Sequence, residues 1–156
     1  MTDNRVSAAL SPEDRQAVME AIQTIRTKLP FLIDLDKDER ASLPRMGDKS
    51  RAFVVKALEV AIQNSDFLPR SFDIEEMQKD VELFEAIYPI WQALTQLCEL
   101  VDDTKVALGS EAYVAALLVY NYAKNTPQGA GLDNAIDDLG KRFARRSRQA
   151  SGGNGG

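Results

Sequence analysis

The stretch from Asp73 to Ala107 places the strongest constraint on how this chain can fold. It contains no glycine, and its apolar residues recur at the spacing of one face of an α-helix. The residues of this face are Met77, Leu83, Phe84, Ile87, Ile90, Trp91, Leu94, Leu97, Cys98, Val101 and Leu108. A broad apolar face of this length is typical of a helix that packs into a core. We therefore expect one long central helix over residues 73–107, with Trp91 buried near its middle.

The start of this helix is marked by capping residues, and its interior by one proline. Asp73 can accept hydrogen bonds from the free N–H groups of the first turn, and Glu76 can bond back to the backbone of Asp73. Phe72 can pack on Met77 as a hydrophobic staple. Pro89 removes one backbone donor and crowds the preceding turn. Because the apolar pattern stays in phase across Pro89, we expect a kink there rather than a break.

Gly109 marks the expected end of the long helix, because glycine readily adopts the left-handed conformation that closes helices. A further helix is then expected over residues 110–125. The segment from Ala112 to Tyr120 contains no charged residue. A helix that is apolar nearly all round is typical of a buried position, so we expect this one at the centre of the fold.

The other predicted helices lie on both sides of these two. Ser11 and Pro12 have the residue types of a helix start, and the chain has no alternating strand pattern. The additional helical segments are expected at 12–28, 37–42 (a short turn), 48–64 and 131–145. Together they predict an all-α fold, a single-domain helical bundle of about five helices over residues 11–148. We expect a flexible N-terminus at 1–10 and a disordered Gly-rich tail at 149–156.

Length and composition support one domain. The chain has 156 residues, of which 44% are hydrophobic and 28% charged, enough for one sizeable core. No apolar run approaches the roughly 18 residues needed to span a bilayer. The first residues do not resemble a signal peptide, since their apolar segment is too short. These features predict a cytoplasmic protein without a transmembrane segment.

The residue types argue against metal and cofactor chemistry. The chain has no histidine and one cysteine, so zinc sites and histidine-containing di-iron sites lack their ligands. Cys98 lies on the apolar face and is interpreted as a small buried hydrophobe rather than a reactive thiol. The adjacent acids Asp102 and Asp103 diverge by ~100° around a helix, so they favour a solvated face over a catalytic pair. We expect a non-enzyme with no cofactor and no metal.

One acidic cluster resembles a calcium loop but departs from its pattern. Asp34, Asp36 and Asp38 are spaced as alternate ligands. However, Glu39 stands where the loop requires glycine, and Arg45 stands where it requires a bidentate acid. We therefore interpret Asp36 and Glu39 as a helix capping box.

Three cations form the sharpest candidate for a small anion site. Arg45, Lys49 and Arg51 surround Gly47 at the start of the helix expected at 48–64, where the helix dipole favours anions. Asp48, taken as the capping residue, would compete for the same N–H groups. The sequence thus favours ordinary solvated charge and leaves a weak alternative of anion binding.

The C-terminal segment from Lys141 to Arg148 carries five basic residues and no acid. The formal net charge of the chain is −5, so the remainder carries −10. An acidic body repels a polyanion, and cations at a helix C-terminus are favourable without any partner. We therefore do not expect nucleic acid as a partner.

Several segments resemble a group of small, uncharacterised all-helical bacterial proteins with no known activity. The segments are LPFLIDL (29–35), LPRMGDKSRAFV (43–54), QNSDFLPRSFD (63–73), LGSEAYVAAL (108–117) and GAGLDNAIDDLGKRFARRSR (129–148). The likeness covers most of the chain. It implies a helical bacterial protein and assigns no functional residue.

Two functions remain open at this stage. The abundance of core-forming surface without a catalytic set favours a non-catalytic interaction or scaffold protein, with a protein partner or a second copy of itself. The alternative is a protein that binds a small apolar ligand inside the bundle. Its walls would come from Tyr88, Trp91, Tyr113, Tyr120 and Tyr122.

Overall fold

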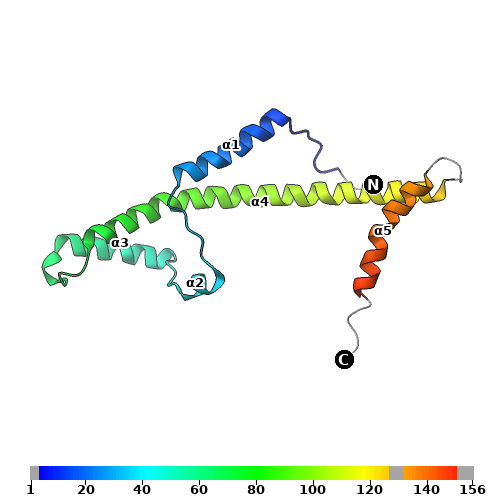
Figure 1. Ribbon diagram of the computed structural model, residues 1–156. Helices are drawn as coiled ribbons and strands as arrows, with labels where there is room; N and C mark the ends of the chain where they lie inside the picture. The colour runs from blue at the N-terminus through cyan, green and yellow to red at the C-terminus, as the bar shows by residue number, and fades with distance from the viewer. Residues whose placement is uncertain (1–3, 127–131, 151–156) are drawn as a thin grey trace, which may run out of the picture. The chain divides into compact units, whose positions relative to one another are not determined.

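The computed structural model describes residues 4–126 and 132–150, the latter range with side chains to Lys141. Within these ranges the chain is all-α and contains no strand, which confirms the expected fold class. Its elements are α1 (Pro12–Lys28), α2 (Lys37–Ser42), α3 (Asp48–Gln63), the 3-10 helix η1 (Ser65–Phe67), α4 (Ile74–Asn125) and α5 (Asp133–Ala150), shown in Figure 1. The tail expected to be disordered lies mostly outside the described residues.

By its internal contacts the chain divides into two units. The N-terminal unit is Ala8–Cys98, and the C-terminal unit combines Met1–Ser7 with Glu99–Gly156. The division falls inside α4, which is nevertheless one continuous helix from Ile74 to Asn125.

The first two helices begin with the capping interactions expected from their sequence. The Asp14 N–H donates to the Ser11 hydroxyl at 3.0 Å at the start of α1. At the start of α2 the Glu39 N–H donates to Asp36 at 2.8 Å, and the Asp36 N–H donates to Glu39 at 3.0 Å. This reciprocal pair is a capping box, which confirms the interpretation of Asp36 and Glu39.

The start of α3 differs from the sequence interpretation. Gly47 is the capping residue, and no side chain caps this end. Asp48 is instead the first helical residue. Its carboxylate interacts favourably with the helix dipole but accepts no capping hydrogen bond from a backbone N–H group. At the other end the Asn64 N–H donates to the Val60 carbonyl at 3.0 Å, close to the predicted boundary.

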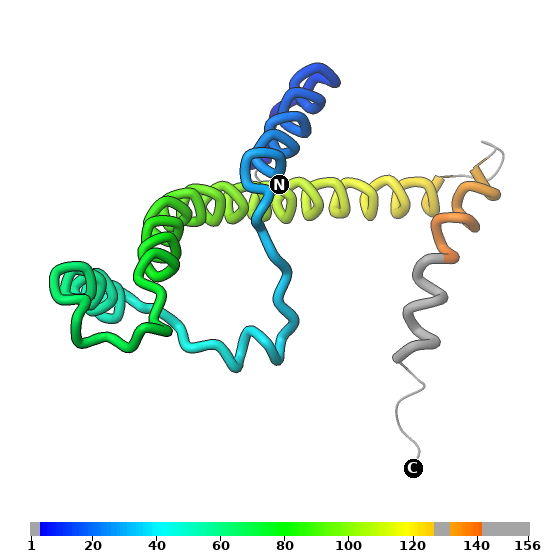
Figure 2. Tube along the Cα trace, turned by 60° about the vertical axis from the view of Figure 1, so that its left-hand side comes forward, coloured from blue at the N-terminus to red at the C-terminus, as the bar shows by residue number. Residues whose placement is uncertain are grey.

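The long helix α4 starts where expected and continues further than expected. The Glu76 N–H donates to the Asp73 carboxylate at 3.0 Å, and the helix runs through Pro89 without a break. Figure 2 shows that its green stretch curves. The helix also runs through Gly109 to Asn125, so the predicted end at Gly109 is wrong. A glycine inside a helix costs only about 0.5–1 kcal/mol relative to alanine, and the good helix formers around it outweigh that cost.

The expected burial of α4 is not found in the single chain. Among the residues whose side chains are described, only Leu58 (9% exposed) and Ala61 (5% exposed) on α3 are buried. Trp91 is 56% exposed, and Cys98 is exposed as well, so both burial predictions are wrong for the isolated chain. The charge-free segment near Leu118 is also largely exposed. An apolar face is buried only where another element covers it, and α4 has little such cover within either unit.

In the C-terminal unit, contacts to α4 come from both ends of the chain. The Arg5 N–H donates to Glu111 of α4 at 2.7 Å. A Cβ atom placed on Gly140 would lie 3.4 Å from the Tyr120 hydroxyl, so the Tyr120 side chain of α4 reaches α5 there.

Candidate functional site

One of the three candidate cations, Arg51, is engaged by α4. Its Nε atom donates to Glu85 Oε1 at 2.6 Å, and its Nη2 atom contacts Glu85 Oε2. The guanidinium also lies over the Tyr88 ring, 4.6 Å from the ring centroid. This planar two-point contact is the geometry in which arginine binds a carboxylate most strongly.

The charges of this pair stabilise each other. The hydrogen bond from Arg51 lowers the pKa of the Glu85 carboxyl below its ordinary value, and the hydrogen bond to Glu85 raises the pKa of Arg51. The Arg51 guanidinium is therefore already neutralised by a partner of its own chain.

The hollow beside Arg51 does not favour an anion. It is lined by Asp48, Arg51, Ala52, Val55, Lys56, Glu59 and Glu85. Three carboxylates and two cations give this lining a net negative charge. Arg45 and Lys49 are exposed and do not line this hollow. Among the described residues, Arg45, Lys49 and Arg51 therefore do not surround a common open site.

Within the described residues, no group of three or more acidic or cysteine side chains is placed to hold a metal ion. The acidic cluster that resembles a calcium loop instead contributes to the start of α2 through Asp36 and Glu39. The geometry of that cluster is that of a helix cap.

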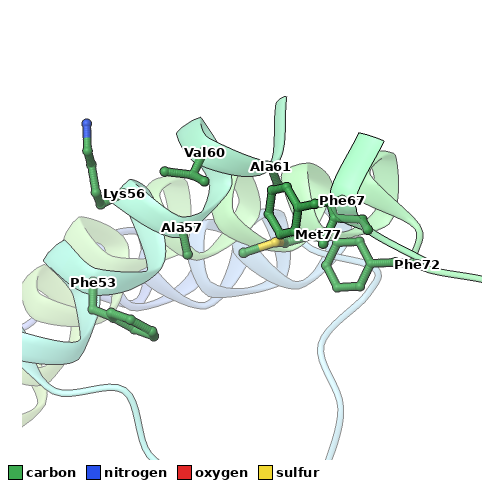
Figure 3. A pocket seen from close by; sticks show the side chains of 9 residues that line it. Phe53, Lys56, Ala57, Val60, Ala61, Phe67, Phe72 and Met77 are labelled. Atoms are coloured by element: carbon green, nitrogen blue, oxygen red, sulfur yellow. The ribbon is translucent and has the colours of Figure 1, made fainter. Parts of the chain in front are cut away.

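An apolar groove lies between α3, η1 and the first turn of α4 (Figure 3). Its volume is about 390 Å³ and its lining residues are Phe53, Lys56, Ala57, Val60, Ala61, Phe67, Leu68, Phe72 and Met77. The α3 members recur three and four residues apart, so they share one helical face. Figure 3 shows Phe67, Phe72 and Met77 close together at one end. Phe67 is 66% exposed, so the groove is open on one side.

A second apolar surface runs along α4. We call it the α4 seam and define it as Leu83, Ile87, Ile90, Leu94, Leu97, Val101, Thr104 and Leu108. Successive members are four and three residues apart, which is the repeat of helices that pack lengthwise on each other. Within the N-terminal unit, its members from Leu83 to Leu97 lie about 60–140° around the helix from Phe84, whose ring centroid is 6.0 Å from the Arg51 guanidinium of α3.

The α4 seam is largely uncovered. Leu97 is 56% exposed and Val101 is 61% exposed, and Leu83, Ile90 and Leu108 are exposed as well. The side towards α3, with Phe84 and Tyr88, is partly covered instead. The sequence pattern merged these two faces into one apolar stripe. Separating them required knowing which side of α4 meets α3, although the regular spacing of four and three was visible.

The aromatic residues proposed as walls of a ligand site do not line the apolar groove. In the N-terminal unit, Tyr88 lies between Phe84 and Trp91, with ring centroids 5.8 and 5.6 Å apart. In the C-terminal unit, Lys124 lies 5.7 Å from the Tyr120 ring centroid. The residues that form an apolar wall are phenylalanines of α3 and of the loop that follows it.

The basic C-terminal segment is described only at its first residue. Lys141 forms an ion pair with Asp138 at 2.8 Å, one turn earlier on α5. The side chains of Arg142, Arg145, Arg146 and Arg148 lie outside the described residues. The interpretation of this segment therefore stays a prediction.

None of the described helices is both long and apolar enough to cross a membrane. Searches against protein-family models, curated proteins and solved structures found no match. Functional inference therefore rests on the geometry of this chain.

Proposed function

We propose that this chain is a non-catalytic helical interaction protein that acts as a scaffold, and that it binds its protein partner through the α4 seam. The observation that carries the proposal is the exposure of this regular apolar surface, with Leu97 and Val101 both more than half exposed. Fully burying one such side chain contributes about 1.5–3 kcal/mol. The seam therefore holds a driving force for association that the chain itself does not use.

The size of this driving force indicates what kind of partner fits. Covering the five exposed aliphatic side chains of the seam contributes on the order of 4–8 kcal/mol. Association itself costs roughly 4–15 kcal/mol in lost translational and rotational freedom. The two quantities are similar, so a partner must follow the seam along its length. A helix laid along α4 meets this requirement better than a small molecule.

The chemistry of the described side chains supports a role without catalysis. Arg51 and Glu85, whose charged forms stabilise each other, form two hydrogen bonds between themselves. Their polar atoms are directed at each other, although both residues also line the hollow described above. From the sequence alone, we further propose that this scaffold is a cytoplasmic bacterial protein.

A second candidate function is supported by the apolar groove of α3. Its volume of about 390 Å³ lies in the range of small-molecule sites, and its lining is almost entirely apolar. Native mass spectrometry of gently purified protein would detect a co-purifying apolar ligand. Loss of that ligand in Phe67→Ser, with retention in the seam variants below, would favour this function over the scaffold.

The scaffold proposal is tested with two charge-matched double variants of α4. The double variant Ile90→Lys with Leu97→Lys places two cations in the seam, and Gln92→Lys with Gln96→Lys places two cations on the opposite side. Tagged chains are expressed in the native host, cross-linked and weighed by mass spectrometry, with helicity measured by circular dichroism. Complexes should form with the wild type and the control and disappear with the seam variant. A wild type without protein partners, or complexes that survive the seam variant, would contradict the proposal.

A further inference from the structure

We infer that residues Asn4–Val6 form an N-terminal strap that Glu111 holds on α4, and that the strap has to open before a partner can cover this part of α4. All of these residues belong to the C-terminal unit, which combines Met1–Ser7 with Glu99–Gly156. The closed strap is carried by its hydrogen bonds to α4. Its regulatory role rests in addition on the proposed function, because it concerns the access of a protein partner to α4.

Two consecutive residues of the strap bind the two oxygens of one carboxylate. The Arg5 N–H donates to Glu111 Oε1 at 2.7 Å, across 106 positions of the sequence. The side-chain amide of Asn4, turned so that its nitrogen faces both acceptors, donates to Glu111 Oε2 at 2.7 Å and to the Val6 carbonyl at 3.2 Å. Hydrogen bonds to an ionised carboxylate are roughly twice as strong as those between neutral groups. The strap is therefore held to α4 at two points.

Glu111 is isolated from other charges along α4. It is the only charged residue between Lys105 and Lys124 in the sequence. The residues three and four positions away, which are its neighbours on the helix surface, are Ala107, Leu108, Val114 and Ala115. A partly covered carboxylate needs hydrogen-bond donors in place of the water that it loses. The strap supplies such donors, and the neighbouring turns of α4 do not.

The burial of the strap and of α4 agrees with this contact. Val6 is half-buried, whereas the other residues from Asn4 to Leu10 are exposed. On α4, Ala107, Glu111 and Val114 are half-buried, whereas residues 108–110, 112 and 113 are exposed. The three half-buried residues are four and three positions apart, so they share one helical face. Because Glu111 lies at the centre of this face, we assign its cover to the strap.

The strap lies beside one end of the α4 seam. Leu108, the last residue of the seam, comes three positions before Glu111, and residues at this spacing are neighbours on a helix surface. Leu108 is 43% exposed. A partner helix is about 10 Å wide with its side chains, so one that packs on Leu108 also reaches the surface around Glu111. The closed strap occupies that surface, and a partner has to displace it.

The contact at Arg5 depends on the backbone of the strap. The donor is a backbone N–H group, which alanine keeps and proline lacks. Arg5→Pro should therefore open the strap, whereas Arg5→Ala should leave it closed. Both substitutions remove the same cation and leave the sequence of α4 unchanged. They form a matched pair that differs in the N–H donor.

Trypsin measures whether the strap is closed, because it cleaves after Arg5 only when the surrounding chain is free to enter its active site. The rate of this cleavage is followed by mass spectrometry in the wild type, in Glu111→Ala and in Glu99→Ala. The exposed Glu99 of α4 is the control. Glu111→Ala should be cleaved about tenfold faster than the other two chains, because it loses two hydrogen bonds to a charged group. Alanine favours helices, so circular dichroism should show that α4 is retained in both variants.

Two outcomes of the trypsin experiment would overturn the strap. The first is an equal rate of cleavage after Arg5 in all three chains. The second is a wild-type rate that falls as the protein concentration rises, since that would show the N-terminal segment bound to a second copy. A strap that closes on its own chain gives a rate that is independent of concentration.

The regulatory role is tested with Arg5→Pro and Arg5→Ala in the cross-linking assay proposed for the seam variants. Arg5→Pro should yield severalfold more complex in the native host than Arg5→Ala. Equal amounts from the two variants would overturn the regulatory role. An absence of complexes from every chain would contradict the scaffold proposal and the regulatory role together, whereas the trypsin rates would still decide whether the strap closes on α4.

Discussion

Arg51 of α3 and Glu85 of α4 form a two-point ion pair beside the Tyr88 ring. Glu85 lies one turn before Pro89, which has no N–H to donate to the Glu85 carbonyl. The pair therefore ties α3 to α4 next to the position where the α4 backbone lacks one of its own hydrogen bonds. It is the most specific polar contact between helices of the N-terminal unit.

The ion pair predicts how stability depends on pH. Because the pKa of Glu85 is lower in the folded chain, its contribution is present above the ordinary glutamate value of about 4.3 and is lost as the pH falls through the lower, folded value. The pKa of Arg51 is raised, so its contribution would be lost only in strong base. Urea unfolding at neutral and acidic pH, followed by circular dichroism, should show a smaller pH dependence in Glu85→Gln than in the wild type. The exposed Glu99→Gln is the control, and equal changes in both variants would exclude this role.

Trp91 is predicted to report on association. It is the only tryptophan, it is 56% exposed, and it flanks the α4 seam. Its emission should resemble that of a solvated indole in dilute protein and shift to shorter wavelength as the concentration rises. Because about half of its surface is exposed, Trp91→Ala should lower the unfolding free energy of the dilute chain by about 1–2 kcal/mol, less than the ~3–5 kcal/mol of a buried aromatic. Emission that is independent of concentration and already blue-shifted would show that Trp91 is covered within one chain.

Gly109→Ala is predicted to stabilise α4. An added Cβ at Gly109 meets nothing within 4 Å, so the change removes the entropic cost of a helical glycine and should raise stability by about 0.5–1 kcal/mol. Gly140→Ala is the comparison, since its Cβ would lie 3.4 Å from the Tyr120 hydroxyl and the gain should be smaller. Thermal unfolding of both variants measures the difference. A loss of stability in Gly109→Ala would mean that another surface approaches α4 closely at this glycine.

Replacing the aspartate at the start of α4 is predicted to cost more stability than replacing the aspartate at the start of α3. Asp73 accepts a hydrogen bond from the Glu76 N–H at 3.0 Å, so Asp73→Ala should cost about 1 kcal/mol. Asp48 makes no cap bond, so Asp48→Ala should cost only its interaction with the helix dipole, about 0.3–1 kcal/mol. Urea unfolding compares the two under the same conditions. A larger cost at Asp48 than at Asp73 would contradict the capping assignment.

Local signals in the sequence predicted the elements well. The start of α1 at Pro12 follows from Ser11, and the caps at Asp36 and Asp73 are made by the predicted side chains. These interactions involve residues within four positions of each other, so their geometry depends little on the rest of the chain. Gly109 misled the prediction because a glycine can end a helix or be tolerated inside one, and the neighbouring turns decide between the two.

The sequence by itself determined the helices and the spacing of four and three along α4, because a helical repeat is a property of one segment. Only the tertiary structure decided that Phe84 and Tyr88 lie beside Arg51 of α3. It also decided which apolar residues of α4 stay exposed, among them Leu83, Leu97 and Val101. It also paired Arg51 with Glu85, two residues that no local pattern connects. Burial depends on a second surface, and a side chain's own position in the sequence does not say whether that surface belongs to the same chain.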